Sequence, residues 1–127
     1  MFNILIIDDT KSVHAFMKSI LSKSPDIHTF GVFDGKQALE HLKSEKNYDL
    51  ILLDWEMPVL NGPSTFQAFV EAGIKIPTMM MTTKNNPEDI QKMLEMGVAE
   101  YLMKPFTIDI LFAKIESVTG KSFTNAA

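Results

Sequence analysis

The strongest constraint on the fold is a short aliphatic run that ends in an acid. Residues 50–53 read Leu-Ile-Leu-Leu with no polar residue between them, and Asp54 follows directly. Such a run predicts a strand buried on both faces, as in the interior of a parallel sheet. Pro58 stops the strand from continuing, because proline lacks the backbone N–H that a sheet requires. Ligands bind at the carboxyl ends of strands in open parallel sheets, so Asp54 is predicted to lie at a binding edge.

The rest of the chain alternates segments of strand character with segments of amphipathic helical character. Further strands are predicted at residues 4–7, 27–33, 76–81 and 99–103, and a helical segment follows each strand. This alternation predicts an α/β fold with a doubly wound, five-stranded parallel sheet, five helices and right-handed crossovers. The helix residues expected to face the core are Val13, Phe16, Met17, Ile20, Leu21, Ala38, Leu39, Leu42, Phe66, Phe69, Val70, Ile108, Leu111, Phe112 and Ile115.

Length and composition narrow the class of protein. We expect one domain over residues 1–127, with its core at 3–119 and a flexible tail at 120–127. The absence of cysteine excludes disulfides and thiolate metal sites, and it is compatible with the cytoplasm. A net charge of −4 argues against nucleic-acid binding, which requires a basic face. We expect no membrane association, since no apolar run is long enough to cross a bilayer.

Polar side chains follow four of the five predicted strands. Asp8 and Asp9 follow the first strand, Asp54 the third, Thr82 the fourth and Lys104 the fifth. Because these ends meet at one edge of a parallel sheet, the side chains are predicted to converge there. Two carboxylates ~5 Å apart repel each other by about 3 kcal/mol at an effective dielectric constant near 20. A divalent cation relieves this repulsion, and Mg²⁺ suits a site built from oxygen ligands.

The pattern resembles the receiver domain of bacterial response regulators over residues 3 to about 119. The resemblance implies the flavodoxin-like strand order 2-1-3-4-5, as in CheY, so the expected fold is CheY-like. It also implies a cis bond between Lys104 and Pro105. The residues that carry the resemblance are Asp8, Asp9, Asp54, Met57, Pro58, Gly62, Thr82, Tyr101, Lys104 and Pro105.

By this resemblance, Asp54 accepts a phosphoryl group from a histidine kinase or a histidine phosphotransfer protein. Lys104 and Thr82 would then bind phosphoryl oxygens. Such a domain catalyses only its own phosphorylation and dephosphorylation, so it is not an enzyme acting on other substrates. The Mg²⁺ ligands implied are Asp9, Asp54 and the backbone carbonyl of Glu56, with Asp8 acting through metal-bound water.

The resemblance also implies how the phosphorylated state is detected. Thr82 moves toward the phosphoryl group, Tyr101 rotates inward, and the face formed by the fourth helix, fifth strand and fifth helix repacks. An output protein, such as a flagellar motor switch, or a phosphatase would recognise that face. We expect a monomer acting in a chemotaxis pathway, in a phosphorelay or as a phosphate sink.

Three other functions fit parts of the pattern. A phosphatase of the haloacid dehalogenase type would place Asp-x-Asp after the first strand, whereas Asp8 and Asp9 are adjacent here. A flavin carrier needs a first loop that binds phosphate, which these two acids would repel. A protein-binding module without phosphorylation would not need the full set of polar strand ends.

Several residues depart from the family pattern or have no role in it. Glu56 puts an acid two positions after Asp54, and Thr83 stands where a small residue is usual. Trp55 is interpreted either as a loop aromatic that partly covers the site or as a residue that reports on the site or contacts a partner protein. The remaining expectation is that His14, His28 and His41 lie on the surface and that none of them is a phosphodonor.

Overall fold

The predicted parallel sheet forms, with its strands in the order β2-β1-β3-β4-β5. The computed structural model describes residues 1–123. The register pairs Ile7 with Leu53 between β1 and β3, and Asp54 with Met81 between β3 and β4. The strand order implied by the resemblance is therefore confirmed. The strands are β1 (Phe2–Ile7), β2 (Ile27–Val32), β3 (Leu50–Asp54), β4 (Thr78–Thr82) and β5 (Glu100–Met103).

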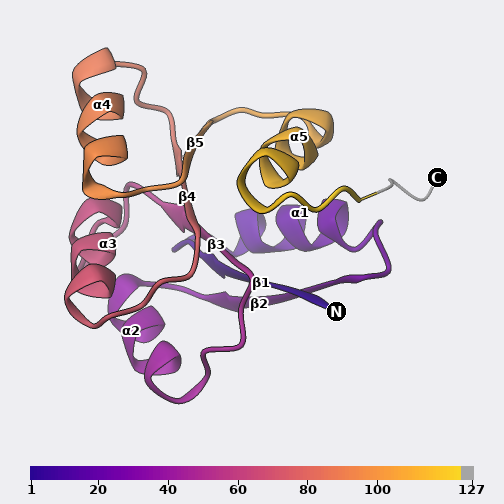
Figure 1. Cartoon of the computed structure of the whole chain (residues 1–127), viewed down its shortest axis with the longest axis horizontal. Coiled ribbons are helices and arrows are strands. Elements are labelled where there is room, and N and C mark those ends of the chain that lie inside the picture. Colours follow the sequence, from indigo (N-terminus) through magenta and orange to yellow (C-terminus); the bar gives the residue numbers. More distant parts are fainter. Residues whose placement is uncertain (124–127) are drawn as a thin grey trace.

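Helices cover both faces of the sheet. Figure 1 shows α1 and α5 on one face and α2, α3 and α4 on the other. None of the helices in the described part of the chain is both long and apolar enough to span a membrane. The helices are α1 (Lys11–Leu21), α2 (Gly35–Ser44), α3 (Gly62–Glu71), α4 (Pro87–Met96) and α5 (Ile108–Thr119).

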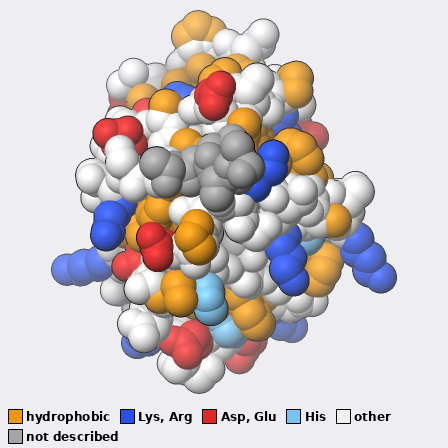
Figure 2. All heavy atoms as spheres, turned by 90° about the vertical axis from the view of Figure 1, so that its right-hand side faces the viewer, with side chains coloured by type: hydrophobic (Ala, Val, Ile, Leu, Met, Phe, Trp, Pro, Cys, Tyr) orange, Lys and Arg blue, Asp and Glu red, His pale blue; other side chains and the backbone are white. Residues whose placement is uncertain are grey.

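The sheet separates two hydrophobic cores. Alternate side chains of β1, β3 and β4 point to opposite faces, so Ile4 and Ile6 join one core while Leu5 and Ile7 join the other. All five residues of β3 are buried, which confirms the prediction made from its uninterrupted aliphatic run. Figure 2 views the side of the molecule at the right of Figure 1, where acidic and basic side chains are interspersed with scattered hydrophobic ones.

Two residues predicted to face the core are instead half exposed. Phe16 and Val70 each expose 49% of their surface. In α1 the buried positions are Met17, Ile20 and Leu21, and Phe16 lies to one side of this stripe, 6.3 Å from the Phe106 ring. An apolar side chain at the edge of a helical stripe keeps the periodicity without being covered.

The prediction of surface histidines is wrong for two of the three. His14 and His41 are half-buried, whereas His28 is exposed. His41 stacks on the Phe30 ring at 4.5 Å, and its Nε2 lies 2.5 Å from the hydroxyl of Tyr48. Both half-buried rings contact aromatic side chains outside their own helices, which helical periodicity does not reveal.

The flexibility of the predicted tail, residues 120–127, stays a prediction, but the described part of this segment contacts the domain. The Phe123 ring packs against Phe2, with 4.9 Å between ring centres, and lies 6.4 Å from the ring of Phe112. The chain therefore stays docked on the first strand and last helix as far as Phe123. The rest of the predicted tail, residues 124–127, lies outside the described residues.

The loop between β3 and α3 contains one strained residue. Val59 has φ = 70° and is 79% exposed. A β-branched side chain in the left-handed region is a true backbone outlier, because Cβ crowds the following carbonyl oxygen. Nothing that Val59 buries offsets this cost, so the loop carries strain beside the end of β3.

Replacing Val59 with glycine should raise the free energy of unfolding by about 1 kcal/mol. Relief of the left-handed strain outweighs the extra backbone entropy of glycine in the unfolded chain. Urea denaturation followed by circular dichroism measures the change. Val70→Gly is the matched control, because the same substitution in α3 should cost about 1 kcal/mol. A loss of stability in Val59→Gly would contradict the assignment of strain.

Candidate functional site

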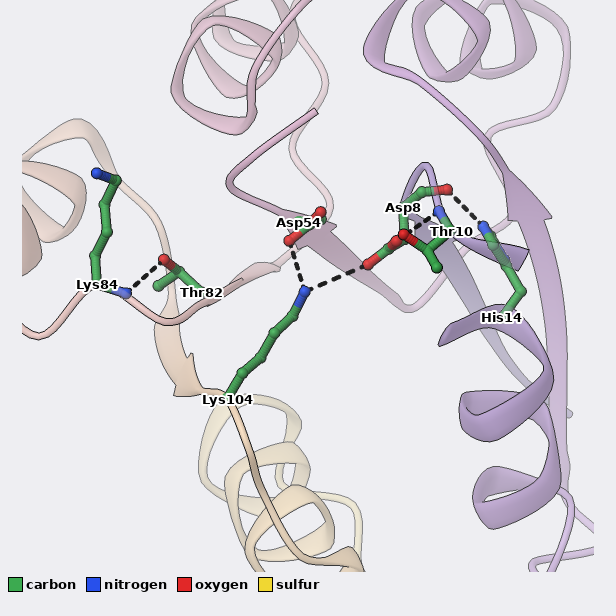
Figure 3. Close-up of polar contacts among 7 residues, drawn as sticks. All are labelled: Asp8, Thr10, His14, Asp54, Thr82, Lys84 and Lys104. Atoms are coloured by element: carbon green, nitrogen blue, oxygen red, sulfur yellow. Dashed lines mark hydrogen bonds and ion pairs between the residues drawn. The ribbon is translucent and has the colours of Figure 1, made fainter. Parts of the chain in front are cut away.

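The polar residues predicted at strand ends do meet at one edge of the sheet. Asp54 and Thr82 are the last residues of β3 and β4, and Asp8 and Lys104 directly follow β1 and β5. Figure 3 shows the Lys104 side chain extending from the end of β5 to a point between Asp54 and Asp8. The parallel sheet thus brings together residues from both ends of the chain, as the sequence predicts.

Three carboxylates form a compact cluster. One oxygen from each of Asp8, Asp9 and Asp54 lies within 4.8 Å of the others. Asp8 is fully buried and Asp54 is 5% exposed, whereas Asp9 is exposed to solvent. Within residues 1–123, no group donates a hydrogen bond to the buried Oδ2 of Asp8. A buried carboxylate oxygen without a donor, among oxygen-only ligands, fits a site for a hard divalent cation.

Lys104 is the positive charge of this cluster. Its Nζ lies 2.8 Å from Asp54 Oδ1 and 3.6 Å from Asp8 Oδ2. Burial raises the pKa of Asp54 above its ordinary value, an effect that the hydrogen bond from Lys104 opposes and the charge of Asp8 reinforces. Burial alone would lower the pKa of Lys104, but its contacts with Asp54 and Asp8 outweigh this and raise it. Lys104 therefore stays charged, and its single ammonium pairs with two of the three acids, Asp54 and Asp8.

The hydroxyl of Thr82 is hydrogen-bonded to the loop that follows β4. Its Oγ1 accepts a hydrogen bond of 2.9 Å from the backbone N–H of Lys84. The side chain of Lys84 extends away from Asp54 in Figure 3, and its Nζ lies 5.5 Å from the centre of the Trp55 ring. To reach a group on Asp54, the Thr82 hydroxyl would have to give up this contact.

Tyr101 in β5 is already turned into the protein. It is 7% exposed, and its hydroxyl oxygen finds no hydrogen-bond partner among the residues that the structure describes. Burial raises the pKa of this phenol. Tyr101 thus occupies the inward position that the resemblance assigns to the phosphorylated form.

Two neighbouring recesses open at this edge of the sheet. One, of about 210 Å³, contains the strand-end residues; the other, of about 460 Å³, lies over the loop after β3. Asp9 and Glu56 line both, so the two recesses are adjacent. Trp55 lines the larger one, as expected for an aromatic beside the site. Besides the two shared residues, the smaller recess is lined by Thr10, Asp54, Thr82, Thr83 and Lys104, and the larger by Trp55, Met57, Pro58, Asn61 and Lys84.

Gly62 allows the loop after β3 to pack closely against the backbone of Asp54 and Trp55. Its backbone N–H donates a hydrogen bond of 2.7 Å to the carbonyl of Trp55. A Cβ at position 62 would lie 2.6 Å from the carbonyl oxygen of Asp54, so only glycine allows this approach. On the other side of the site, the Lys104–Pro105 peptide bond is cis, as the resemblance implies.

Comparison with known protein families agrees with this arrangement. The model of the response regulator receiver domain family matches residues 4–116, which is most of the chain. The chain belongs to the response regulator receiver family. A receiver domain is a phosphorylation-activated switch of two-component or chemotaxis signalling, and this one is a signalling switch of that kind.

Relatives of this receiver domain include both short and long proteins. It is 32% identical to the chemotaxis protein CheY of Pseudomonas aeruginosa over 117 residues, covering 91% of this chain and 94% of that protein. It is 33% identical to the transcriptional regulatory protein DltR of Streptococcus agalactiae over 122 residues, covering 94% of this chain. The chain spans about half the length of DltR, at 52%.

Solved structures share the fold. The receiver domain of the Francisella response regulator 1452 has a TM-score of 0.86 at 32% identity and covers 94% of this chain and 98% of its own. Vibrio cholerae CheY4 has a TM-score of 0.83 at 28% identity and covers 93% of this chain and 98% of its own. The receiver fold is therefore established by sequence and by structure.

Two residues at this edge were not predicted to belong to the site: Thr10 was not considered, and His14 was expected on the surface. The backbone N–H of Thr10 donates to Asp8 Oδ1 at 2.9 Å, and the Nε2 of His14 lies 2.7 Å from the carbonyl oxygen of Asp8. The first contact has a sequence signal, since aspartate commonly accepts a bond from the N–H two residues ahead. The second contact has none, because it depends on the angle at which α1 leaves the sheet.

Proposed function

We propose that Asp54 is the phosphoryl acceptor of this receiver domain. The observation that supports this most directly is the Lys104 ammonium, held 2.8 Å from a buried Asp54 carboxylate. Lys104 favours the ionised form of Asp54 that attacks phosphorus, and its charge offsets the negative charge that a phosphoryl group adds. In this reaction a bond forms between a carboxylate oxygen of Asp54 and phosphorus, while the bond from phosphorus to the donor's histidine nitrogen breaks.

The proposal includes Mg²⁺ as the cofactor. Its ligands would be Asp9, Asp54 and the backbone carbonyl of Glu56, with Asp8 acting through metal-bound water. When bound, the ion supplies positive charge against the phosphoryl oxygens. The buried Oδ2 of Asp8, without a hydrogen-bond donor in residues 1–123, and the mutual repulsion of three acids both favour occupation by a cation.

Thr82 and Tyr101 would carry the change from the site to the surface. The Thr82 hydroxyl leaves the N–H of Lys84 and binds a phosphoryl oxygen in its place. Tyr101 lies on the neighbouring strand and is already inward, so the movement of Thr82 would fix its ring rather than draw it in from solvent. The face formed by α4, β5 and α5 would then present the phosphorylated state to a partner.

Receiver domains interact with histidine kinases and with output partners. For this chain we propose a sensor histidine kinase or a histidine phosphotransfer protein as donor. The output partner would be another protein, such as a flagellar motor switch, or a phosphatase, in keeping with relatives named as chemotaxis proteins. A cytoplasmic monomer that binds neither nucleic acid nor membrane completes the proposal.

Incubation with acetyl phosphate and Mg²⁺ tests the central claim. The intact mass should increase by one phosphoryl group, and peptide mapping should place that group on Asp54. Chelation of Mg²⁺ with EDTA should suppress the reaction, because the metal-free acids repel an incoming phosphoryl group. An adduct that maps to another residue would refute Asp54 as the acceptor.

A further inference from the structure

The imidazole of His14 is held on three sides where β1 ends and α1 begins. Its Nε2 lies 2.7 Å from the carbonyl oxygen of Asp8, a contact drawn in Figure 3. Its ring centre lies 4.4 Å from that of Phe33. On the third side is Gly31 of β2, where a Cβ would lie only 2.4 Å from Nδ1. The missing side chain of Gly31 therefore makes the space that the ring fills.

The direction of the hydrogen bond follows from its acceptor. A carbonyl oxygen only accepts, so the Nε2 of His14 must carry a proton and donate it to Asp8. With Nδ1 facing Gly31, the ring has one orientation in which this bond forms. The contact therefore ties α1 to the backbone of the residue that begins the acid cluster.

Within the described residues, the start of α1 lacks the side-chain cap that is present at the starts of the other helices. Thr10 is the N-cap of α1, and within the described residues its side chain makes no capping hydrogen bond. Instead, the Thr10 N–H and the His14 ring both donate to Asp8. The other four helices are capped by the side chains of Asp34, Asn61, Asn86 and Thr107.

We infer that His14 is a positioning residue for the divalent-cation site. Its hydrogen bond fixes the backbone of the turn from Asp8 to Thr10, which carries two of the three clustered carboxylates. This inference rests on the proposed function, since it concerns the same Mg²⁺ site. Loss of a group that orients metal ligands typically weakens metal affinity by about 10- to 100-fold.

Titration with Mg²⁺, followed by calorimetry and by the fluorescence of Trp55, tests the inference. His14→Phe keeps a ring against Phe33 but has no donor, and its Mg²⁺ affinity should fall by about tenfold. His14→Gln keeps an N–H donor and should recover most of the affinity. His28→Gln, at an exposed histidine outside the site, should bind Mg²⁺ as the unaltered protein does. Urea unfolding without Mg²⁺ separates this effect from a general loss of stability.

A second pair of variants tests the same contact from β2. Gly31→Ala should weaken Mg²⁺ binding by displacing the imidazole, but should have no further effect in a His14→Ala background, where the ring is gone. Mg²⁺ affinity unchanged in His14→Phe would overturn the inference and leave Asp54 as the acceptor. Failure of the unaltered protein to bind Mg²⁺ would contradict the proposed function, and the role of His14 would fall with it.

Discussion

Replacing Asp54 with asparagine is expected to abolish phosphorylation by acetyl phosphate. The amide keeps the size of the side chain but has no anionic oxygen to attack phosphorus. It also removes one of the three clustered negative charges and the anionic partner of Lys104, while the amide oxygen remains a hydrogen-bond acceptor. Intact-mass measurement over the time course that labels the unaltered protein should show no adduct.

The same variant should remain folded and become more stable. Because burial raises the pKa of Asp54, its folded-state value lies above its unfolded-state value. The stability that this carboxyl contributes is present below an unfolded pKa of about 4 and is lost as the pH rises through the folded value. Removing the acid should therefore raise the free energy of unfolding near neutral pH in the absence of Mg²⁺.

Asp26→Asn provides the matched control for both measurements. Asp26 is exposed, before β2 and away from the edge that carries Asp54, so its loss should change neither labelling nor stability. Retention of the adduct in Asp54→Asn would refute the site. Unfolding of Asp54→Asn at neutral pH would show instead that the carboxylate is needed for the fold.

Replacing Lys104 with methionine is expected to destabilise the metal-free protein by about 2 kcal/mol at neutral pH. The substitution leaves Asp8 and Asp54 buried without their shared cation. Removing one partner of a fully buried ion pair typically costs about 3–5 kcal/mol, and the figure is lower here because the Lys104 side chain is 26% exposed. Urea unfolding in EDTA measures the loss.

The stability loss caused by Lys104→Met should depend on pH. Without the hydrogen bond and charge of Lys104, which both lower the pKa of Asp54, that pKa should rise further. The difference in free energy of unfolding between Lys104→Met and the unaltered protein should therefore grow as the pH rises from about 4. It should shrink at lower pH, where Asp54 becomes protonated. A deficit that is the same at every pH would contradict this electrostatic origin.

Lys114→Met is the matched control, because Lys114 forms a 3.4 Å ion pair with Glu100 in which both side chains are about one-third exposed. Its loss should cost less than about 1 kcal/mol. Adding Asp54→Asn to Lys104→Met should restore part of the lost stability, since one of the two uncompensated carboxylates is then gone and Asp8 remains. Equal losses of stability in Lys104→Met and Lys114→Met would show that burial does not strengthen the ion pairs of Lys104.

The sequence predicts the sheet and the site well because both depend on strong local patterns. The aliphatic run before Asp54 has one simple interpretation, a strand covered on both faces, and β3 is buried throughout. Polar residues directly after parallel strands must share an edge, so Asp8, Thr82 and Lys104 could be placed together without coordinates. The roles of these residues in phosphoryl transfer stay predictions.

The features that the sequence did not predict depend on how elements pack. The exposure of Phe16 follows from the rotation of α1 on the sheet, which periodicity constrains only to within a residue. The burial of His14 requires the notch at Gly31 and the ring of Phe33, both on or just beyond β2. Docking of Phe123 on Phe2 joins residues from opposite ends of the described chain, beyond the range of any local pattern.

The strand order has a consequence for the folding chain. Asp8 and Asp54 lie on adjacent strands near the start and middle of the sequence, but Lys104 arrives only when β5 pairs with β4. A chain that has formed only its first three strands therefore has the clustered carboxylates of Asp8, Asp9 and Asp54 without the ammonium of Lys104. Under the proposed function, the phosphodonor is therefore expected to react only with the domain whose fifth strand has paired, since Lys104 completes the site.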